Sequence, residues 1–531
     1  MMSVNNKRIS SIILINLLLA LVSLWKDILL AGYLGTSAQA DAFLLAYFII
    51  DTIGNNLLAN ALGVAVIPVL AGLYESGEDQ RLNTLTRLVV VYTVTISTLI
   101  AFLMFGMRFG LLSWVGAGLS EPSRQLSVGL FTLLIPSVVV FPLINIGISI
   151  MQVHNRFNIP ALAPVLFNAI YLIGLSYLLY FKTPLVIGVY GLAQFIIIGL
   201  LVMVSMVWLP ILKYRLIVLP TWASIYNSLF RNKIDEVIKQ RLLTVSLDLV
   251  TVWKSFLPFL ITLLFPQIIY LVERYLASHL ETGSISGLNY AFRLVQFPLW
   301  VFIAAVSNVL FPVMAKLSLI GDKQGLNKVL MNSIYFTSLF TIPFSIILFV
   351  LRVPIISILL QRGEFSSHSV VITANIMAGY TLTIIWQGFS VIWVRASLAE
   401  GRVFYALLAA AISAVSTIGF DLILVPLMGA AGLGYGAAIG AIINFSTLYM
   451  LFSRFSHFQF SKLFIGLLKI VLANLPLLLV TVLFSQLWVR IAGIGTFGSR
   501  FGYAAVVIIV CLPVYWLSLR FFRVELFEKE M

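Results

Sequence analysis

Fourteen long apolar stretches, separated by short polar loops, constrain this chain more than any other feature. Most exceed the roughly 20 residues that an α-helix needs to cross a bilayer. Of the 531 residues, 61% are hydrophobic and only 10% are charged, which excludes a soluble globular protein. The pattern predicts an all-α polytopic membrane protein with fourteen transmembrane helices. The expected spans are residues 9–33, 40–73, 86–115, 127–152, 161–181, 184–211, 253–280, 284–316, 329–360, 368–397, 403–425, 430–453, 463–488 and 499–521.

The net charge of +14 follows membrane topology rather than nucleic-acid binding. With the N-terminus in the cytoplasm, Lys and Arg of the predicted inner segments outnumber those of the outer segments about threefold, as the positive-inside rule requires. We therefore expect a multi-pass protein of the bacterial cytoplasmic (inner) membrane, with both termini cytoplasmic. Anionic membrane lipids are expected partners. The first apolar run is too long for a signal peptide and contains Lys26 and Asp27, which favours a retained helix.

Motifs for metal, nucleotide or covalent chemistry are missing from the sequence. Cys511 is the only cysteine, and the four histidines lack metal-ligand spacing. No phosphate-binding loop of the Walker type is present, so ATP is not the expected driver. The sequence thus predicts a protein that is not an enzyme and has no certain metal site.

The chain contains an internal repeat. The segment Ile67–Ala71 recurs as Phe311–Ala315, and at the same offset Gly77 pairs with Gly321. Six helices in each half give both halves one orientation, which is typical of transporters that work by alternating access. A basic loop joins the halves and includes an expected amphipathic surface helix at Ser228–Leu243. The predicted domains are an N-terminal lobe at 1–212, a basic cytoplasmic linker at 213–252, a C-terminal lobe at 253–455, and two added helices at 456–531.

Charged residues interrupt three of the apolar spans. They are Lys26 with Asp27, Glu273 with Arg274, and Arg293. A charge at bilayer depth costs roughly 3 kcal/mol or more, so it normally faces a partner or a water-filled cavity. The basic members therefore indicate binding of a transported anion.

Several short motifs follow one another along the chain. They are Leu24-Trp25-Lys26-Asp27 followed by Ala40-Asp41-Ala42-Phe43, Asn155-Arg156-Phe157 followed by Ile159-Pro160-Ala161, Gly283–Ser286 followed by Arg293-Leu294, Gln361–Phe365, and Gly429 through Gly434. In this order and at these depths, the motifs resemble those of the MurJ/MviN lipid II flippases across essentially the whole chain.

The resemblance implies a fold of the multidrug/oligosaccharidyl-lipid/polysaccharide exporter superfamily. It also implies a lipid-linked oligosaccharide substrate, undecaprenyl pyrophosphate carrying a sugar-peptide head group, with the prenyl tail along a groove of the last two helices. Lys26 and Arg293 match basic residues of the family's first and eighth helices, which implies that they bind the pyrophosphate. The family often has further basic residues where this chain has Ala20, Gly54 and Asn55. These departures leave another polyprenyl-linked glycan open as the substrate.

The residues expected to bind substrate are Lys26, Asp27, Asp41, Arg274 and Arg293. Two structural alternatives stand beside this interpretation. Lys26 could form a buried ion pair with Asp27 or Asp41 that holds the first two helices together. Asp41, at the start of the second apolar span, could cap that helix.

A coupling cation is expected at a second group of residues. Family members that bind sodium use an acid in helix seven, an Asn-x-x-x-Asp in helix eleven and a Thr in helix twelve. The matching positions here are Glu273, Thr417 with Asp421, and Ala437. Thr417 and Asp421 share a helix face, and their oxygens suit Na⁺ or H⁺. The alternative is an ion pair of Glu273 with Arg274 or Arg293.

The lead hypothesis is a flippase that moves the peptidoglycan precursor lipid II to the outer leaflet by alternating access. A flippase for an exopolysaccharide or O-antigen unit is the first alternative. A drug/cation antiporter is the second. A scaffold that joins a cell-wall or glycan-synthesis complex through the basic 213–252 loop is the third. No nucleic-acid partner is expected.

Overall fold

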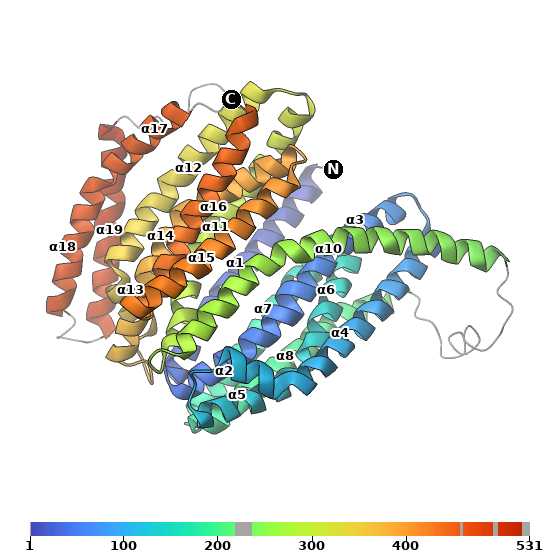
Figure 1. Cartoon of the computed structure of the whole chain (residues 1–531), viewed down its shortest axis with the longest axis horizontal. Helices are drawn as coiled ribbons and strands as arrows, with labels where there is room; N and C mark the ends of the chain where they lie inside the picture. Colours follow the sequence, from blue (N-terminus) through green and yellow to red (C-terminus); the bar gives the residue numbers. More distant parts are fainter. Residues whose placement is uncertain (1, 218–235, 457–459, 492–496, 523–531) are drawn as a thin grey trace. The chain divides into compact units, whose positions relative to one another are not determined.

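The described part of the chain is built from α-helices and one π-helical segment (Figure 1). The structure is a computed structural model, and it describes residues 2–217, 236–456, 460–491 and 497–522. Within these residues, twelve helices are long and apolar enough to cross a membrane, or thirteen when one bent pair is counted as a single span. The predicted all-α polytopic membrane fold is confirmed, with a span count just below the predicted fourteen. The predicted span at 284–316 is a continuous helix, but several of its side chains lie outside the described residues.

The elements follow one another in this order: α1 (Met2–Leu34), α2 (Ala38–Ile50), η1 (Asp51–Ala59), α3 (Asn60–Glu75), α4 (Asp79–Val115), α5 (Glu121–Leu134), α6 (Ser137–Val153), α7 (Asn158–Tyr180), α8 (Leu185–Lys213), α10 (Glu236–Ser278), α11 (Ser284–Leu319), α12 (Lys323–Val350), α13 (Arg352–Leu360), α14 (Ser367–Ala399), α15 (Val403–Met428), α16 (Ala431–Ser456), α17 (Phe460–Ala473), α18 (Leu475–Ile491) and α19 (Phe497–Phe521).

The chain divides into two compact units. The first comprises Met1–Leu34 and Ala38–Gln267, and the second comprises Gly35–Ser37 and Ile268–Met531. Helix α10 begins inside the segment predicted as a linker and contributes residues to both units. The predicted lobe boundaries remain a prediction, and most of the expected surface helix at Ser228–Leu243 lies outside the described residues.

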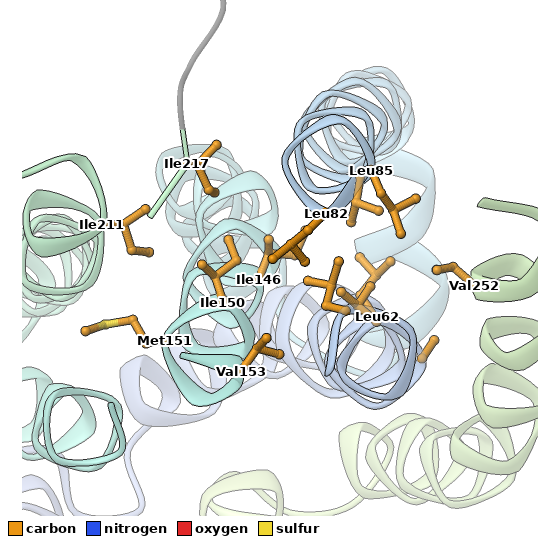
Figure 2. Packing of buried hydrophobic residues seen from close by; sticks show 14 of the residues in the cluster. Leu62, Leu82, Leu85, Ile146, Ile150, Met151, Val153, Ile211, Ile217 and Val252 are labelled. Atoms are coloured by element: carbon orange, nitrogen blue, oxygen red, sulfur yellow. The ribbon is translucent and has the colours of Figure 1, made fainter. Parts of the chain in front are cut away.

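The first unit packs around an apolar cluster formed by α3, α4, α6, α8 and the start of α10. Figure 2 shows Leu62, Leu85 and Ile146 pointing into this cluster from three different helices. Arg81 of α4 reaches Asp248 of α10 through two short hydrogen bonds, of 2.6 Å from Nε and 2.7 Å from Nη2. This bidentate pair fixes the first part of α10 to α4.

Helix α2 continues into α3 through the π-helical segment η1. Two amide side chains, those of Asn55 and Asn56, each donate a hydrogen bond of 3.1 Å to the carboxylate of Asp51. These hydrogen bonds bring the side chains of Asp51, Asn55 and Asn56 together on one side of the span. Such segments occur frequently at functional sites of membrane and soluble proteins.

Helix α14 is the most buried span of the second unit, with 72% of its apolar window inside the fold. It packs against α11, α12 and α16. Trp393 of α14 is fully buried and contacts the rings of Tyr449 and Phe452 from α16. A separate apolar cluster around Trp488 and Tyr503 joins α18 to α19.

The turn between α1 and α2 belongs to the second unit. The hydroxyl groups of Thr36 and Ser369 lie 2.8 Å apart. Gly35 has a φ of +56°, and a Cβ there would lie 2.3 Å from the carbonyl oxygen of Glu364. Only glycine satisfies both the left-handed conformation and this close approach.

Candidate functional site

Lys26 is a buried cation in the membrane-spanning part of α1. Lys26 is only 5% exposed, and its Nζ lies 3.2 Å from Oδ1 of Asp27. On another side, the ammonium group lies 5.3 Å from the centre of the Tyr171 ring of α7. The ion pair with Asp27, which the sequence offered as a structural alternative, is therefore present. Both contacts stabilise a positive charge at this depth.

Asp41 lies in the first turn of α2 and is 2% exposed. A carboxylate in the first turn of a helix interacts favourably with the helix dipole. This placement is consistent with a structural role at the start of the helix.

Arg274 and Arg293 lie in the second unit, on α10 and α11. Arg274 is buried, and its Nη1 donates a hydrogen bond of 3.1 Å to the carbonyl oxygen of Tyr270 on its own helix. Arg293 is partly buried and is an electrostatic neighbour of Arg274. Arg274 also interacts electrostatically with the carboxylate of Glu273, which is the pairing that the sequence left open as an alternative to a cation site. Arg293 is the more exposed of the two arginines.

The structure brings two carboxylates predicted for a coupling cation near each other. Glu273 of α10 is 1% exposed, Asp421 of α15 is 0% exposed, and the two groups interact electrostatically. Thr417, one helical turn before Asp421, is also buried. Oε1 of Glu273 and both carboxylate oxygens of Asp421 have no hydrogen-bond partner among the described residues. Buried oxygens without partners favour a bound cation or proton, because leaving them unsatisfied is costly.

A tyrosine that the sequence analysis did not single out completes this group. Tyr380 of α14 is 3% exposed and is an electrostatic neighbour of both Glu273 and Asp421. Its hydroxyl oxygen is buried and adjoins the carboxylate of Glu273. Nothing in the local sequence distinguishes this tyrosine from a core aromatic, so only the tertiary packing reveals it.

The departures from the resembled family have a structural basis at the π-helical segment. Gly54 is buried against α6, where an added Cβ would lie 3.0 Å from Cα of Val138 and from the Phe141 ring. A basic side chain at this position would crowd α6, whose residues would have to shift. The Asn55 side chain donates a hydrogen bond to Asp51, so the π-helical segment carries amide groups where the resembled family often has cations.

No group of three or more His, Cys, Asp and Glu side chains that could hold a metal ion occurs within the described ranges. The group around Asp421 has two carboxylates and two hydroxyl-bearing side chains instead. That set suits a small monovalent cation better than a transition metal.

Comparison with known proteins gives consistent results. The family described as "Lipid II flippase MurJ" matches residues 30–502 of the chain. A "Probable lipid II flippase MurJ" from Vibrio cholerae is 27% identical over 466 residues, which cover 83% of this chain and 81% of that protein. A "Lipid II flippase MurJ" from Burkholderia cenocepacia is 25% identical over 449 residues, covering 82% of this chain and 81% of that protein.

Solved structures show the same fold. "Lipid II flippase MurJ, inward closed conformation" superposes with a TM-score of 0.70 at 24% identity, covering 96% of this chain and 98% of that one. An inward-facing multidrug resistance MATE family transporter of the MOP superfamily superposes with a TM-score of 0.67 at 17% identity, covering 82% and 95% of the two chains. The chain therefore shares the fold of these two solved proteins.

Proposed function

Because the chain belongs to the lipid II flippase MurJ family, we propose that it moves lipid II across the bacterial cytoplasmic membrane by alternating access. The long match to the family and the multi-pass helical fold support this proposal. The substrate is an undecaprenyl-pyrophosphate-linked peptidoglycan precursor. Its sugars need a hydrated path, its pyrophosphate needs cations, and its tail remains in lipid.

The observation that carries the proposal is the buried ammonium group of Lys26. A lysine at this depth is expensive to keep charged, and here the Asp27 carboxylate, 3.2 Å away, and the Tyr171 ring stabilise the charge. A phosphate oxygen would add a further acceptor beside Asp27 for the ammonium group, which is a donor of hydrogen bonds only. Lysine contacts phosphate as a point charge, whereas the guanidinium of Arg293 can form a bidentate contact. Each of the two residues is proposed to bind the pyrophosphate.

The same proposal includes a coupling cation at Glu273, Thr417 and Asp421. Binding of Na⁺ or H⁺ would neutralise buried carboxylate charge and thereby favour one conformation of the carrier. A charge that crosses a potential of 100 mV gains about 2.3 kcal/mol, which is enough to bias return of the empty carrier. The protein is proposed to act without covalent chemistry. Both termini are proposed to lie in the cytoplasm, and a cell-wall synthesis complex is the proposed partner.

Rescue of a bacterial strain depleted of its own lipid II flippase tests the function directly. We expect growth and normal cell shape when this chain is expressed. A correctly inserted protein that fails to rescue would contradict the assignment to lipid II.

A second candidate substrate is another polyprenyl-linked glycan, such as an exopolysaccharide or O-antigen unit. The packing of Gly54 against α6 favours this second candidate, because a basic side chain of the kind that the resembled family often has near this position would crowd α6. Flipping of lipid II and of an undecaprenyl-pyrophosphate oligosaccharide in the same proteoliposomes separates the two candidates. Faster transport of the oligosaccharide would select the second.

A further inference from the structure

Helices α15 and α16 approach each other through glycines that face the candidate cation site. A Cβ added to Gly436 would lie 1.9 Å from Oδ1 of Asp421, and a Cβ added to Gly440 would lie 1.8 Å from Oγ1 of Thr417. Ser413 also donates a hydrogen bond of 2.9 Å to the carbonyl oxygen of Gly440. The side chains of Asp421 and Thr417 therefore occupy space that any other residue on α16 would fill.

The polar groups in this interface are buried, and Asp421 lacks a partner that would explain its burial. Both of its carboxylate oxygens are without a hydrogen-bond partner within the part of the chain that the structure describes, whereas the Glu273 carboxylate adjoins the Tyr380 hydroxyl and the Arg274 guanidinium. The three residues are at most 3% exposed. Unpaired oxygens at this depth point to a ligand that supplies positive charge or a proton.

Tyr380 supplies an oxygen that α16 lacks. Sodium-binding members of the resembled family carry a threonine in helix twelve. The matching residue on α16 is Ala437, which has no hydroxyl. Tyr380 comes from α14 and interacts electrostatically with both carboxylates. Its phenol oxygen is therefore available to the site from a different helix.

We propose that Tyr380 is a ligand of the coupling cation and that Gly436 and Gly440 are its positioning residues. The occupant is one small hard cation, Na⁺ or H⁺. For Na⁺, the phenol oxygen would join the two carboxylates and the Thr417 hydroxyl as a ligand. For H⁺, it would hydrogen-bond to the carboxylate pair that shares the proton. This inference rests on the coupling cation of the proposed function and identifies which further side chains bind it.

The site would connect α10, α14, α15 and α16 within the second unit. Each of these helices contributes one part: Glu273, Tyr380, Asp421 with Thr417, and the glycine surface of α16. Occupation of the site would hold the four helices together by contacts that an empty site cannot make. Cation binding is therefore expected to raise the thermal stability of the folded protein.

The test uses the purified full chain in nanodiscs and measures thermal unfolding. One arm varies Na⁺ against choline at constant pH, and the other varies pH at constant Na⁺. The arm in which the wild-type protein is stabilised identifies the cation. Tyr380→Phe removes only the hydroxyl. We expect it to raise the cation concentration needed for half-maximal stabilisation at least about tenfold, because a tenfold change in affinity corresponds to the free energy of one hydrogen bond or ligand to a charged group. Tyr290→Phe is the matched control, since Tyr290 is equally buried but packs on Phe365.

Gly436→Ala tests the positioning role. The new Cβ must displace the Asp421 carboxylate, so we expect a similar loss of cation response. Gly419→Ala is the control on the facing helix, because nothing lies within 4 Å of its added Cβ. If Gly436→Ala does not fold, Tyr380→Phe still decides the proposal.

Two results would overturn the inference. One is a midpoint for Tyr380→Phe within twofold of the wild-type value, and the other is a wild-type protein that responds in neither arm. Lipid II flipping is measured separately in the same preparation. A protein that flips lipid II without a cation response overturns the site alone, whereas a protein that binds the cation but flips no lipid II overturns the proposed transport function.

Discussion

The pair between Arg81 and Asp248 offers a quantitative test of how the first part of α10 is held. Its two hydrogen bonds of 2.6 and 2.7 Å form a bidentate contact between α10 and α4. The Arg81 side chain is 32% exposed and that of Asp248 is 14% exposed, so solvent screens part of the interaction. Exposed pairs contribute about 0.2–1 kcal/mol, and bidentate geometry places this one at the upper end, near 1 kcal/mol.

A double-mutant cycle isolates this interaction from the contact that Arg81 also makes with Glu78. The variants are Arg81→Ala, Asp248→Ala and the double substitution, and denaturant unfolding in mixed micelles gives their free energies of unfolding. We expect a coupling energy of about 1 kcal/mol in low salt that falls in 1 M salt, where the screening length is about 3 Å. A coupling energy near zero, or one that is unchanged by salt, would refute this account.

Two further substitutions test the close helix packing. Gly54→Arg introduces a cation at a position where the resembled family often has one nearby, but its Cβ would crowd Val138 of α6. We expect a lower thermal midpoint and no gain in lipid II affinity; a gain in affinity would show that the segment has room. Gly379→Ala would place a Cβ 2.1 Å from the carbonyl carbon of Gly434, and overpacking of this kind costs about 1–3 kcal/mol. Gly106→Ala has open space around its Cβ and serves as control, so equal thermal midpoints for these two variants would contradict the packing argument.

The sequence predicted the membrane fold and part of the candidate site for identifiable reasons. Apolar length decides where helices cross a bilayer, so almost all spans were found from composition alone. Thr417 and Asp421 were predicted to share a face because residues four apart do so on any α-helix. The proximity of Glu273 to Asp421 was predicted only by family resemblance, since the two residues lie on helices far apart in sequence.

Other features could not be predicted, because hydropathy does not encode hydrogen-bond register or interhelical distance. The π-helical segment at Asp51–Ala59 is more polar than the helices on either side, but its residue types do not specify a π-helical rather than an α-helical turn. The predicted span at 127–152 is two helices, α5 and α6, that meet near Pro136 with a bend of 40°. Tyr380 resembles any core aromatic residue until α14 is packed against its neighbours. The close contacts of Gly436 likewise depend on tertiary structure.

The central claim is that Lys26 and Arg293 bind the substrate pyrophosphate. The most direct measurement is the rate of lipid II flipping in proteoliposomes by Lys26→Ala, Arg293→Ala and the exposed-site control Arg108→Ala, each with its folding verified by thermal unfolding. The account predicts at least about tenfold slower flipping for each of the first two variants, because a charge-assisted contact to phosphate is worth about 1.5–3 kcal/mol, and a wild-type rate for the control. Wild-type flipping by both Lys26→Ala and Arg293→Ala would contradict the claim.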